Sequence, residues 1–202
     1  MIAFDQEAKA DGFRFLFGVD EAGRGPLAGP VVAAAVCLRE TSFTNRIDDS
    51  KLLSPLQRRK AFDEIFEHGW VGLGVMSETV IDDVNILRAT HLAMSMSVSD
   101  LCSHLPAEMR RETVKILIDG NSFSGTVPFK VKTVIGGDAK SLSIACASII
   151  AKVYRDRVME KFDRLYPGYG FSIHKGYGTA SHREAVKKLG RCPIHRRTFS
   201  IK

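Results

Sequence analysis

The sequence predicts a single α/β domain with a mixed central β-sheet flanked by helices. Two observations lead to this prediction. Short apolar segments alternate along the chain with longer segments of helical character. In addition, 202 residues with 45% hydrophobic and 26% charged side chains are enough for one large core and typical of a globular domain. We see no internal repeat, low-complexity tract or linker, so residues 1–202 are treated as one domain.

Five segments have the composition of β-strands. The first two flank a glycine- and proline-rich segment at 23–30, which predicts a hairpin with a wide loop. The second strand consists of eight consecutive apolar residues rich in valine and alanine, as expected of a buried strand. The expected strands are residues 14–20, 31–38, 70–76, 114–119 and 129–135.

Capping residues indicate where the helices begin. Ser54 followed by Pro55 predicts one N-terminus, and Ser77 predicts the start of a short second helix. A long segment from Ser141 starts with small and apolar residues and ends with charged ones, which predicts a long helix. The expected helices cover residues 55–67, a short segment after 77, 86–104, 141–165 and 180–189.

Several protein classes are excluded at this point. No segment approaches the roughly 18 apolar residues of a membrane-spanning helix, and residues 1–12 lack a hydrophobic signal core. A cytoplasmic protein without a membrane partner is therefore expected. The four cysteines lie far apart, with no pair at zinc-ligand spacing, so we expect reduced thiols that pack as small hydrophobic side chains. They are Cys37, Cys102, Cys146 and Cys192.

The net charge of +6 is concentrated near the C-terminus. From residue 175 onward Glu184 is the one acidic residue, against eight basic ones: Lys175, Arg183, Lys187, Lys188, Arg191, Arg196, Arg197 and Lys202. A basic segment beside clustered carboxylates suggests an arm that contacts phosphates, so we predict a basic helical substrate-binding extension at residues 166–202. Charge alone leaves a merely solvated basic helix equally open.

Carboxylates occur where three apolar or glycine-containing segments end. They are the pair Asp20 and Glu21, then Asp119, then Asp138. Strand ends of an α/β sheet converge on a shared crevice, and carboxylates that meet there repel one another unless cations are present. Oxygen ligands without histidine or cysteine favour Mg²⁺ or Mn²⁺, and two ions about 4 Å apart support in-line hydrolysis of a phosphodiester. A strand-end aspartate can also simply cap a turn, so these residues alone leave both interpretations open.

A long motif resolves this ambiguity. Residues 18–30 read GVDEAGRGPLAGP, in which an acidic pair is followed by a Gly-Arg-Gly loop. Further blocks follow in order along the chain: Asp49-Ser50-Lys51, Ile118-Asp119-Gly120-Asn121, Gly137-Asp138 leading into Ala147 to Val153, Arg155-Asp156, Tyr169-Gly170-Phe171, His174 to Thr179, His182, and His195-Arg196. Over residues 14–199 the chain resembles the type 2 ribonucleases H, and the arginine of its Gly-Arg-Gly loop and its His174 to Thr179 block resemble the bacterial HII form.

The resemblance implies a fold, a reaction and a set of catalytic residues. The expected fold is ribonuclease H-like, with a helical C-terminal segment. Asp20, Glu21, Asp119 and Asp138 are expected to be catalytic and to bind two Mg²⁺ or Mn²⁺ ions, with Asp20 bridging both. The expected substrates are RNA–DNA hybrids and duplex DNA with an embedded ribonucleotide. Hydrolysis 5′ to the ribonucleotide would leave a 3′-hydroxyl and a 5′-phosphate, in ribonucleotide repair and removal of RNA primers.

Residues for substrate binding follow from the same resemblance. Gly23, Arg24 and Gly25 form a loop whose backbone can approach a 2′-hydroxyl closely, because glycine has no Cβ. Tyr177 matches the tyrosine that packs on the sugar at the RNA–DNA junction. Lys51 and Lys175 are expected to contact phosphates.

Other polar residues receive structural interpretations. The small residues from Ser148 to Lys152 are expected to allow close helix packing rather than to form a nucleophile–lysine pair. Tyr169 is expected to be structural. His174, His182 and His195 are not at metal-ligand spacing, and we assign them to structure or to phosphate contact.

Three alternatives stay open. An enzyme with the same chemistry could need several consecutive ribonucleotides, although the Gly-Arg-Gly loop and Tyr177 argue against it. A non-catalytic hybrid-binding protein would have little reason to keep four carboxylates, and a metal protein unrelated to nucleic acid leaves the basic tail unexplained. We expect a monomer, and we do not expect the tail to recruit a sliding clamp, because we see no clamp-binding peptide in it.

Overall fold

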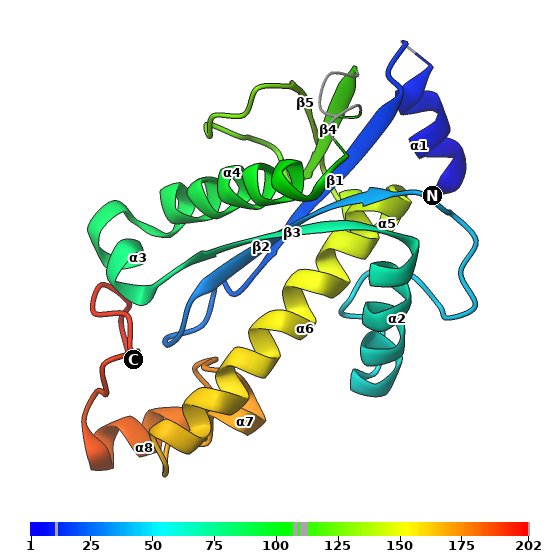
Figure 1. Ribbon diagram of the computed structural model, residues 1–202. Coiled ribbons are helices and arrows are strands. Elements are labelled where there is room, and N and C mark those ends of the chain that lie inside the picture. The colour runs from blue at the N-terminus through cyan, green and yellow to red at the C-terminus, as the bar shows by residue number, and fades with distance from the viewer. Residues whose placement is uncertain (11, 107–108, 110–112, 202) are drawn as a thin grey trace.

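The computed structural model describes residues 1–10, 12–106, 109 and 113–201, so Lys202 of the basic tail lies outside the described residues. Five strands form one sheet in the order β3-β2-β1-β4-β5 (Figure 1). Their bounds are β1 (Phe15–Ala22), β2 (Val31–Leu38), β3 (Gly69–Met76), β4 (Val114–Asp119) and β5 (Lys130–Val134). Neighbours among β1 to β3 are antiparallel, whereas β4 is parallel to both β1 and β5. The predicted mixed sheet and the hairpin of the first two strands are confirmed.

The predicted helices are also present. The described helices are α1 (Ile2–Lys9), α2 (Pro55–His68), α3 (Glu78–Val84), α4 (Ile86–His104), α5 (Gly137–Lys140), α6 (Leu142–Leu165), α7 (Phe171–His174) and α8 (Ala180–Leu189). Ser54, Ser77 and Ser141 each accept a hydrogen bond from a backbone N–H of the first turn that follows, as their cap positions predict. Helices α1, α5 and α7 were not predicted.

The helices cover both faces of the sheet (Figure 1). Side chains alternate along each strand, so Val31, Ala33 and Ala35 pack toward α4, while Val32, Ala34 and Val36 pack toward α6 and α2. Two buried clusters result, one on each face. This alternation makes the fully buried β2 continuously apolar and gives a three-layer α/β/α domain.

Gly18 in β1 lets helix α6 begin very close to the sheet. A Cβ at this position would lie 2.1 Å from the backbone carbonyl carbon of Ser143, closer than any real contact. The absence of a side chain therefore brings the first turns of α6 against the middle of β1. The side chains that follow on this helix consequently reach the C-terminal end of the same strand.

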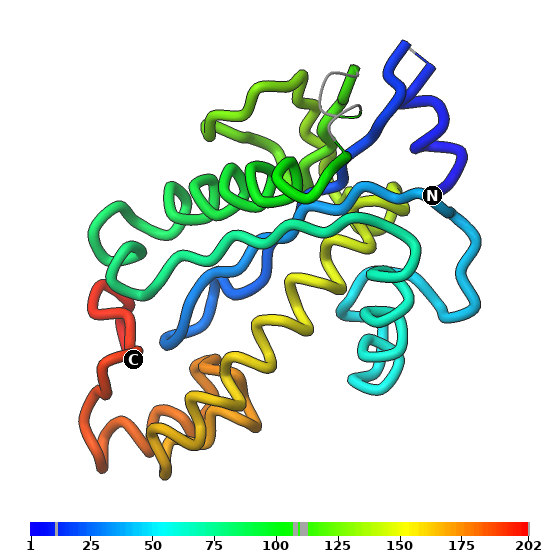
Figure 2. Tube along the Cα trace, viewed as in Figure 1, coloured from blue at the N-terminus to red at the C-terminus, as the bar shows by residue number. Residues whose placement is uncertain are grey.

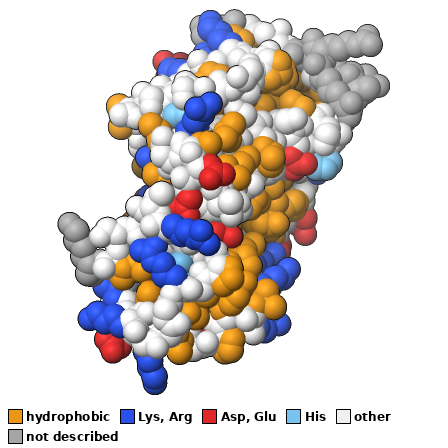
Figure 3. Space-filling view, turned by 90° about the vertical axis from the view of Figure 1, so that its left-hand side faces the viewer, with side chains coloured by type: hydrophobic (Ala, Val, Ile, Leu, Met, Phe, Trp, Pro, Cys, Tyr) orange, Lys and Arg blue, Asp and Glu red, His pale blue; other side chains and the backbone are white. Residues whose placement is uncertain are grey.

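The C-terminal segment has a small core of its own beyond the sheet. Phe171 of α7 and Val186 of α8 pack there with Met159 near the end of α6. The chain then runs back to α3 (Figure 2), where Asp82 accepts hydrogen bonds from the backbone of Arg197 and Thr198. On the face seen in Figure 3, Lys and Arg side chains gather over the lower part of the molecule, where α8 and the end of α6 lie.

Two predictions about the class of protein can be compared with the structure. All four cysteines are free thiols, and Cys37 and Cys146 are buried, as predicted. In the part of the chain that the structure describes, no helix has the length and apolar character needed to cross a membrane.

Glu64 of α2 fixes the segment that leads to Lys51. Its buried carboxylate accepts four hydrogen bonds of 2.6–2.9 Å from the backbone and side chains of Thr44 and Asn45. Burial alone would raise the pKa of Glu64, but these hydrogen bonds lower it from 4.5 to about 2. The folded state therefore gains stability that is complete above pH 4.5 and is lost as the pH falls toward 2.

We expect Glu64→Gln to lower the free energy of unfolding by about 2 kcal/mol at pH 7, because a charged acceptor is lost from four hydrogen bonds. The deficit relative to the original protein should shrink below pH 4.5. Urea unfolding at pH 7 and pH 3 measures both effects. Glu67→Gln, an exposed change on the same helix, is the control. Equal stability of the two variants at pH 7 would contradict the assigned role of Glu64.

Candidate active site

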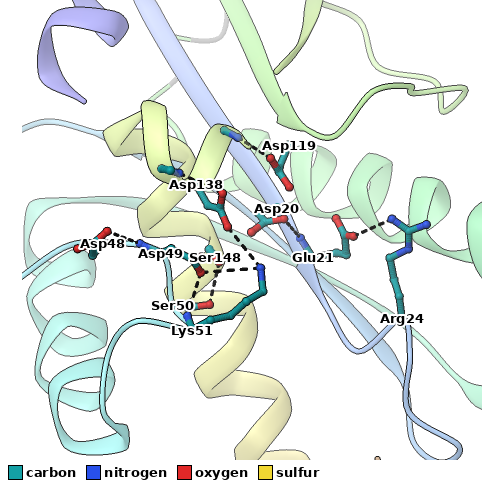
Figure 4. Close-up of polar contacts among 12 residues, drawn as sticks. Asp20, Glu21, Arg24, Asp48, Asp49, Ser50, Lys51, Asp119, Asp138 and Ser148 are labelled. Carbon is teal, nitrogen blue, oxygen red and sulfur yellow. Dashed lines mark hydrogen bonds and ion pairs between the residues drawn. The ribbon is translucent and has the colours of Figure 1, made fainter. Parts of the chain in front are cut away.

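The strand register brings Asp20 and Asp119 together. In the parallel ladder Val19 of β1 is opposite Ile118 of β4, so the next residues of the two strands are Asp20 and Asp119. Neighbouring strands lie about 4.8 Å apart, and residues at matching positions point to the same face. Both carboxylates therefore lie on the face covered by α6, as Figure 4 shows. The prediction that strand-end acids converge is correct for this pair.

The other two acids complete a group of four around this point (Figure 4). Glu21 lies one position further along β1, and its Oε1 is 3.3 Å from Nη1 of Arg24. Asp138 lies on α5, whose first residue, Gly137, donates its N–H to Oδ1 of Asp119 at 2.6 Å. The Nζ of Lys51 is 3.5 Å from Oδ2 of Asp138 and thereby closes the group on one side.

Burial and mutual repulsion disfavour the ionised forms of these acids. The pKa of Asp20 is raised well above 3.8 by burial and then by the charges of Glu21 and Asp119. Burial raises the pKa of Glu21 despite the nearby guanidinium of Arg24. The pKa of Asp138 is raised by burial and by the charges of Asp49 and Asp119, and Lys51 offsets only part of this. Additional positive charge would stabilise the ionised forms of all three.

This donor set fits a divalent cation that prefers oxygen ligands. Carboxylates without histidine or cysteine suit Mg²⁺ and Mn²⁺, and their raised pKa values show that the group is short of positive charge. Over the described ranges, no three or more His, Cys, Asp or Glu side chains are already arranged to hold a metal ion. The fit therefore rests on donor chemistry and charge rather than on a preformed coordination shell.

Two buried arginines hold the segment from Gly23 to Pro30, which includes the Gly-Arg-Gly loop. Arg196 donates to the carbonyl oxygens of Gly23, Arg24, Pro26 and Gly29 at 2.5–3.0 Å. Arg155 donates to the carbonyl oxygens of Ala28, Pro30 and Lys175 at 2.9–3.1 Å. In the described part of the chain, the N–H groups of residues 23–25 have no protein acceptor. The loop therefore turns the carbonyls of Gly23 and Arg24 inward and leaves the amide groups of the exposed residues Arg24 and Gly25 available.

The two glycines of the loop differ in how much space surrounds them for a side chain. At Gly23, with φ of +100°, a Cβ would lie 2.0 Å from Nε of Arg155, whereas at Gly25 its nearest neighbour would be Cε1 of Tyr177 at 3.8 Å. Gly23→Ala should therefore lower the melting temperature and displace the loop, while Gly25→Ala should keep the melting temperature. We expect Gly25→Ala to act instead by narrowing the approach to the loop, which raises KM. Thermal unfolding and steady-state cleavage of both variants test this difference, and equal melting temperatures would contradict it.

Tyr177 stands across from this loop on a rigid support. Its side chain is 44% exposed. Its carbonyl oxygen is bonded to Nδ1 of His182 at 2.9 Å, and Nε2 of His182 is 3.1 Å from Nε2 of His195. His174 stacks on His182 with ring centroids 4.4 Å apart. All three histidines are buried, so the structural half of their assignment is confirmed; buried Tyr169 packs beside them.

One open cleft of about 220 Å³ brings most of the predicted residues together. It is lined by Asp20, Glu21, Asp119, Gly23, Arg24, Gly25, Lys51 and Tyr177, and also by Ala22, Ser50, Ser148 and Lys152. Asp138 joins this group through Lys51. Lys175 does not: its Nζ binds Oε1 of Glu160 at 2.9 Å and the carbonyl oxygen of Ser172. The structure thus places Lys175 outside the cleft, in a groove beside it.

Comparison with known proteins decides the family. The family model described as "Ribonuclease HII" matches residues 17–202. The chain belongs to the ribonuclease HII family. It is 46% identical to a ribonuclease HII of Acetivibrio thermocellus over 201 residues, which make up 99% of this chain and 75% of that protein. It is 48% identical to the ribonuclease HII of Geotalea uraniireducens over 202 residues, covering 98% of this chain and 88% of the relative.

Solved structures agree with the ribonuclease HII assignment. The ribonuclease H2 of Pyrococcus horikoshii superposes with a TM-score of 0.71 at 28% identity and covers 93% of this chain and 94% of that one. The Bst-RNase HIII structure in complex with Mn²⁺ has a TM-score of 0.68 at 18% identity, covering 93% of this chain and 67% of that one, which shows a shared fold. The predicted ribonuclease H-like fold is thereby confirmed.

Two serines of this ribonuclease HII cleft were not predicted as site residues. Ser148 of α6 lines the cleft beside Asp20 and favours the ionised form of that carboxyl, lowering its pKa, and the Oγ of Ser148 is 3.0 Å from Oγ of Ser50. Small residues around Ser148 were interpreted as packing residues, and most of them are buried against the sheet. Ser148 itself also contacts the central carboxylate. One signal could have identified Ser148 as a site residue. It lies on the face of α6 that packs against β1, where Gly18 allows the helix to come close.

Proposed function

We propose that this chain hydrolyses RNA in RNA–DNA hybrids and cuts duplex DNA on the 5′ side of an embedded ribonucleotide. The products would be a 3′-hydroxyl and a 5′-phosphate. The observation that carries this proposal is one cleft in which three carboxylates, with Asp138 beside them, lie together with a glycine loop and an exposed tyrosine. Membership of the ribonuclease HII family supports it, as does the name that relatives with 46–49% identity share.

The loop and Tyr177 are suited to recognise a ribonucleotide without reading its base. The free amide groups of the exposed residues Arg24 and Gly25 can donate to the 2′-hydroxyl or to the adjacent phosphate, whatever the base is. Gly25 lies close to the Tyr177 ring, since a Cβ at Gly25 would be in van der Waals contact with Cε1 of that ring at 3.8 Å. A sugar that packs on the exposed part of the ring therefore also comes next to the backbone of the loop. We propose Gly23, Arg24, Gly25 and Tyr177 as the residues that select the ribonucleotide.

The carboxylates would hold the metal ions of the reaction. We propose that Asp20, Glu21, Asp119 and Asp138 bind two Mg²⁺ or Mn²⁺ ions. When bound, such ions supply a Lewis acid and lower the pKa of a coordinated water. Asp20 is kept in place by the hydrogen bond that its Oδ1 accepts from the N–H of Glu21 at 2.7 Å. The ammonium of Lys51 can reach a phosphate at the edge of the cleft.

The C-terminal segment would extend the substrate site. We propose residues 166–202 as this extension, because α7 and the turn after it carry Tyr177 and because the segment packs around its own small core. We also propose that the active form is a monomer. Gel filtration with light scattering measures the oligomeric state directly.

Cleavage of a labelled DNA duplex with one embedded ribonucleotide tests the proposed function. With Mg²⁺ or Mn²⁺ we expect a single incision on the 5′ side of the ribonucleotide, and with chelator we expect none. An otherwise identical all-DNA duplex is the control. Cleavage of a long hybrid without incision at the single ribonucleotide would contradict the proposed role of Tyr177 and the loop. Absence of cleavage on both substrates would overturn the proposal as a whole.

A further inference from the structure

A second hollow with basic walls adjoins the cleft. It has a volume of about 410 Å³ and lies between the N-terminal part of α2, the middle of α6 and α7. Its basic side chains are Arg58, Arg59, Lys152, Arg157 and Lys175, and its acidic ones are Asp156 and Glu160. Lys152 lines both this hollow and the cleft. We refer to the hollow as the α2–α6 groove, and it shares the lining residue Lys152 with the cleft.

The three arginines give the α2–α6 groove an excess of positive charge. Both acids are already paired, Asp156 with Lys152 at 2.7 Å and Glu160 with Lys175 at 2.9 Å. Among the described residues, Arg58, Arg59 and Arg157 form no ion pair with a carboxylate. Their charges are therefore available to an anion that enters the groove.

The arginines are also held in position. Arg58 donates from Nη1 to the carbonyl oxygens of Ser50 and Leu53, so it is bound to the segment that carries Lys51. The guanidinium of Arg157 lies over the ring of Phe62, with Cζ 4.3 Å from the ring centroid. A stacked guanidinium keeps its edge free to donate two parallel hydrogen bonds to a phosphate. Arg59 is exposed at the rim.

We propose that the α2–α6 groove binds the phosphodiester backbone of the duplex that flanks the cleaved ribonucleotide. This inference rests on the proposed function. Along α6, Arg157 follows Ser148 by nine residues, which corresponds to about 13 Å of helix. That length equals roughly four base-pair steps of duplex. The groove would thus contact backbone about four base pairs from the cleavage point and fix the direction in which the duplex leaves the cleft.

Arg59→Glu and Lys60→Glu form a matched pair for testing the groove. Both change the net charge equally, both sites are exposed on α2, and Lys60 does not line the groove. Binding of a duplex with one ribonucleotide is measured in chelator by fluorescence anisotropy between 50 and 200 mM salt. We expect Arg59→Glu to weaken binding roughly threefold to tenfold at low salt and to reduce the salt slope by about 1. Lys60→Glu should stay close to the original protein in both measures.

Shortened duplexes locate the contact. One flank of the duplex can be shortened to about three base pairs on the side that enters the groove. The difference in binding affinity between the two variants should then vanish, because the contacted phosphates are missing. Cutting the opposite flank should leave the difference unchanged. Equal binding of both variants to the long duplex would overturn the inference, as would a difference that persists when both flanks are short. The cleavage assay with the original protein is independent, so failure of the groove leaves the proposed function standing.

Discussion

Asp20→Asn is expected to reduce cleavage by about 10³-fold or more, equivalent to about 4 kcal/mol of transition-state stabilisation. Asp20 is the buried carboxylate between Glu21 and Asp119, and we propose it as a residue that would hold the metal ions. An amide has similar shape but cannot carry the negative charge that binds a cation. Binding of the hybrid should be retained, because the glycine loop, Tyr177 and the groove are unaffected. Single-turnover cleavage and anisotropy in chelator measure the two properties separately.

The same variant should be at least as stable as the original protein without metal. Because burial and two neighbouring acids raise the folded pKa of Asp20, its ionisation destabilises the folded state as the pH rises above 3.8 and through the raised value. Asparagine removes that cost. Asp63→Asn, on the exposed face of α2, is the control and should retain activity and metal response. Substantial cleavage by Asp20→Asn, or an undiminished stabilisation by Mg²⁺, would contradict the assignment.

Arg196→Met is expected to be the most destabilising single change at the site. Its buried guanidinium makes five hydrogen bonds to four carbonyl oxygens between Gly23 and Gly29. Without it these acceptors are left unpaired, and since each such group costs about 1–3 kcal/mol, we expect a loss of at least about 3 kcal/mol. Urea unfolding measures the loss, and cleavage should fall with it because the loop is no longer held.

Two further variants distinguish geometry from charge at this position. Arg197→Met removes an equal charge from the exposed neighbour and should leave stability close to that of the original protein. Arg196→Lys keeps the charge but cannot reach four carbonyls from one planar group, so it should recover little of the loss. Full recovery by lysine would show that charge alone holds the loop and would contradict the geometric explanation.

Most of the fold follows from patterns that are local in the sequence. The run from Val31 to Leu38 was predicted with its observed bounds, because a strand buried on both faces is apolar at every position. Helix α1 was not predicted, since its sequence mixes charges and its N-cap, Met1, makes no side-chain cap. Its stability comes from a distant contact instead: the buried Asp5 accepts hydrogen bonds from the backbone and hydroxyl of Ser143.

The residues of the site also fall into two groups, those that local sequence patterns predict and those that depend on distant contacts. The acids could be predicted because each ends a recognisable strand or segment, and the motif around Asp20 is long. The roles of Arg155 and Arg196 could not, because Arg196 binds carbonyls some 170 positions earlier in the chain. The position of Lys175 depended on Glu160, which is two-fifths exposed on the facing helix and gives no local signal. Contacts of this kind depend on how the helices pack against the sheet and against one another. No single segment of the sequence determines that packing.

The sheet order also determines when this protein can become active during its synthesis. Strands β1, β2 and β3 are complete once residue 76 has left the ribosome, but β1 then has an unpaired edge. Its parallel partner β4 follows roughly 100 residues after β1, which at typical bacterial rates of about 5–20 residues per second means a delay of about 5–20 s. Until then the nascent chain exposes a flat, apolar strand edge beside Asp20. This interval is when aggregation or chaperone binding would compete with folding.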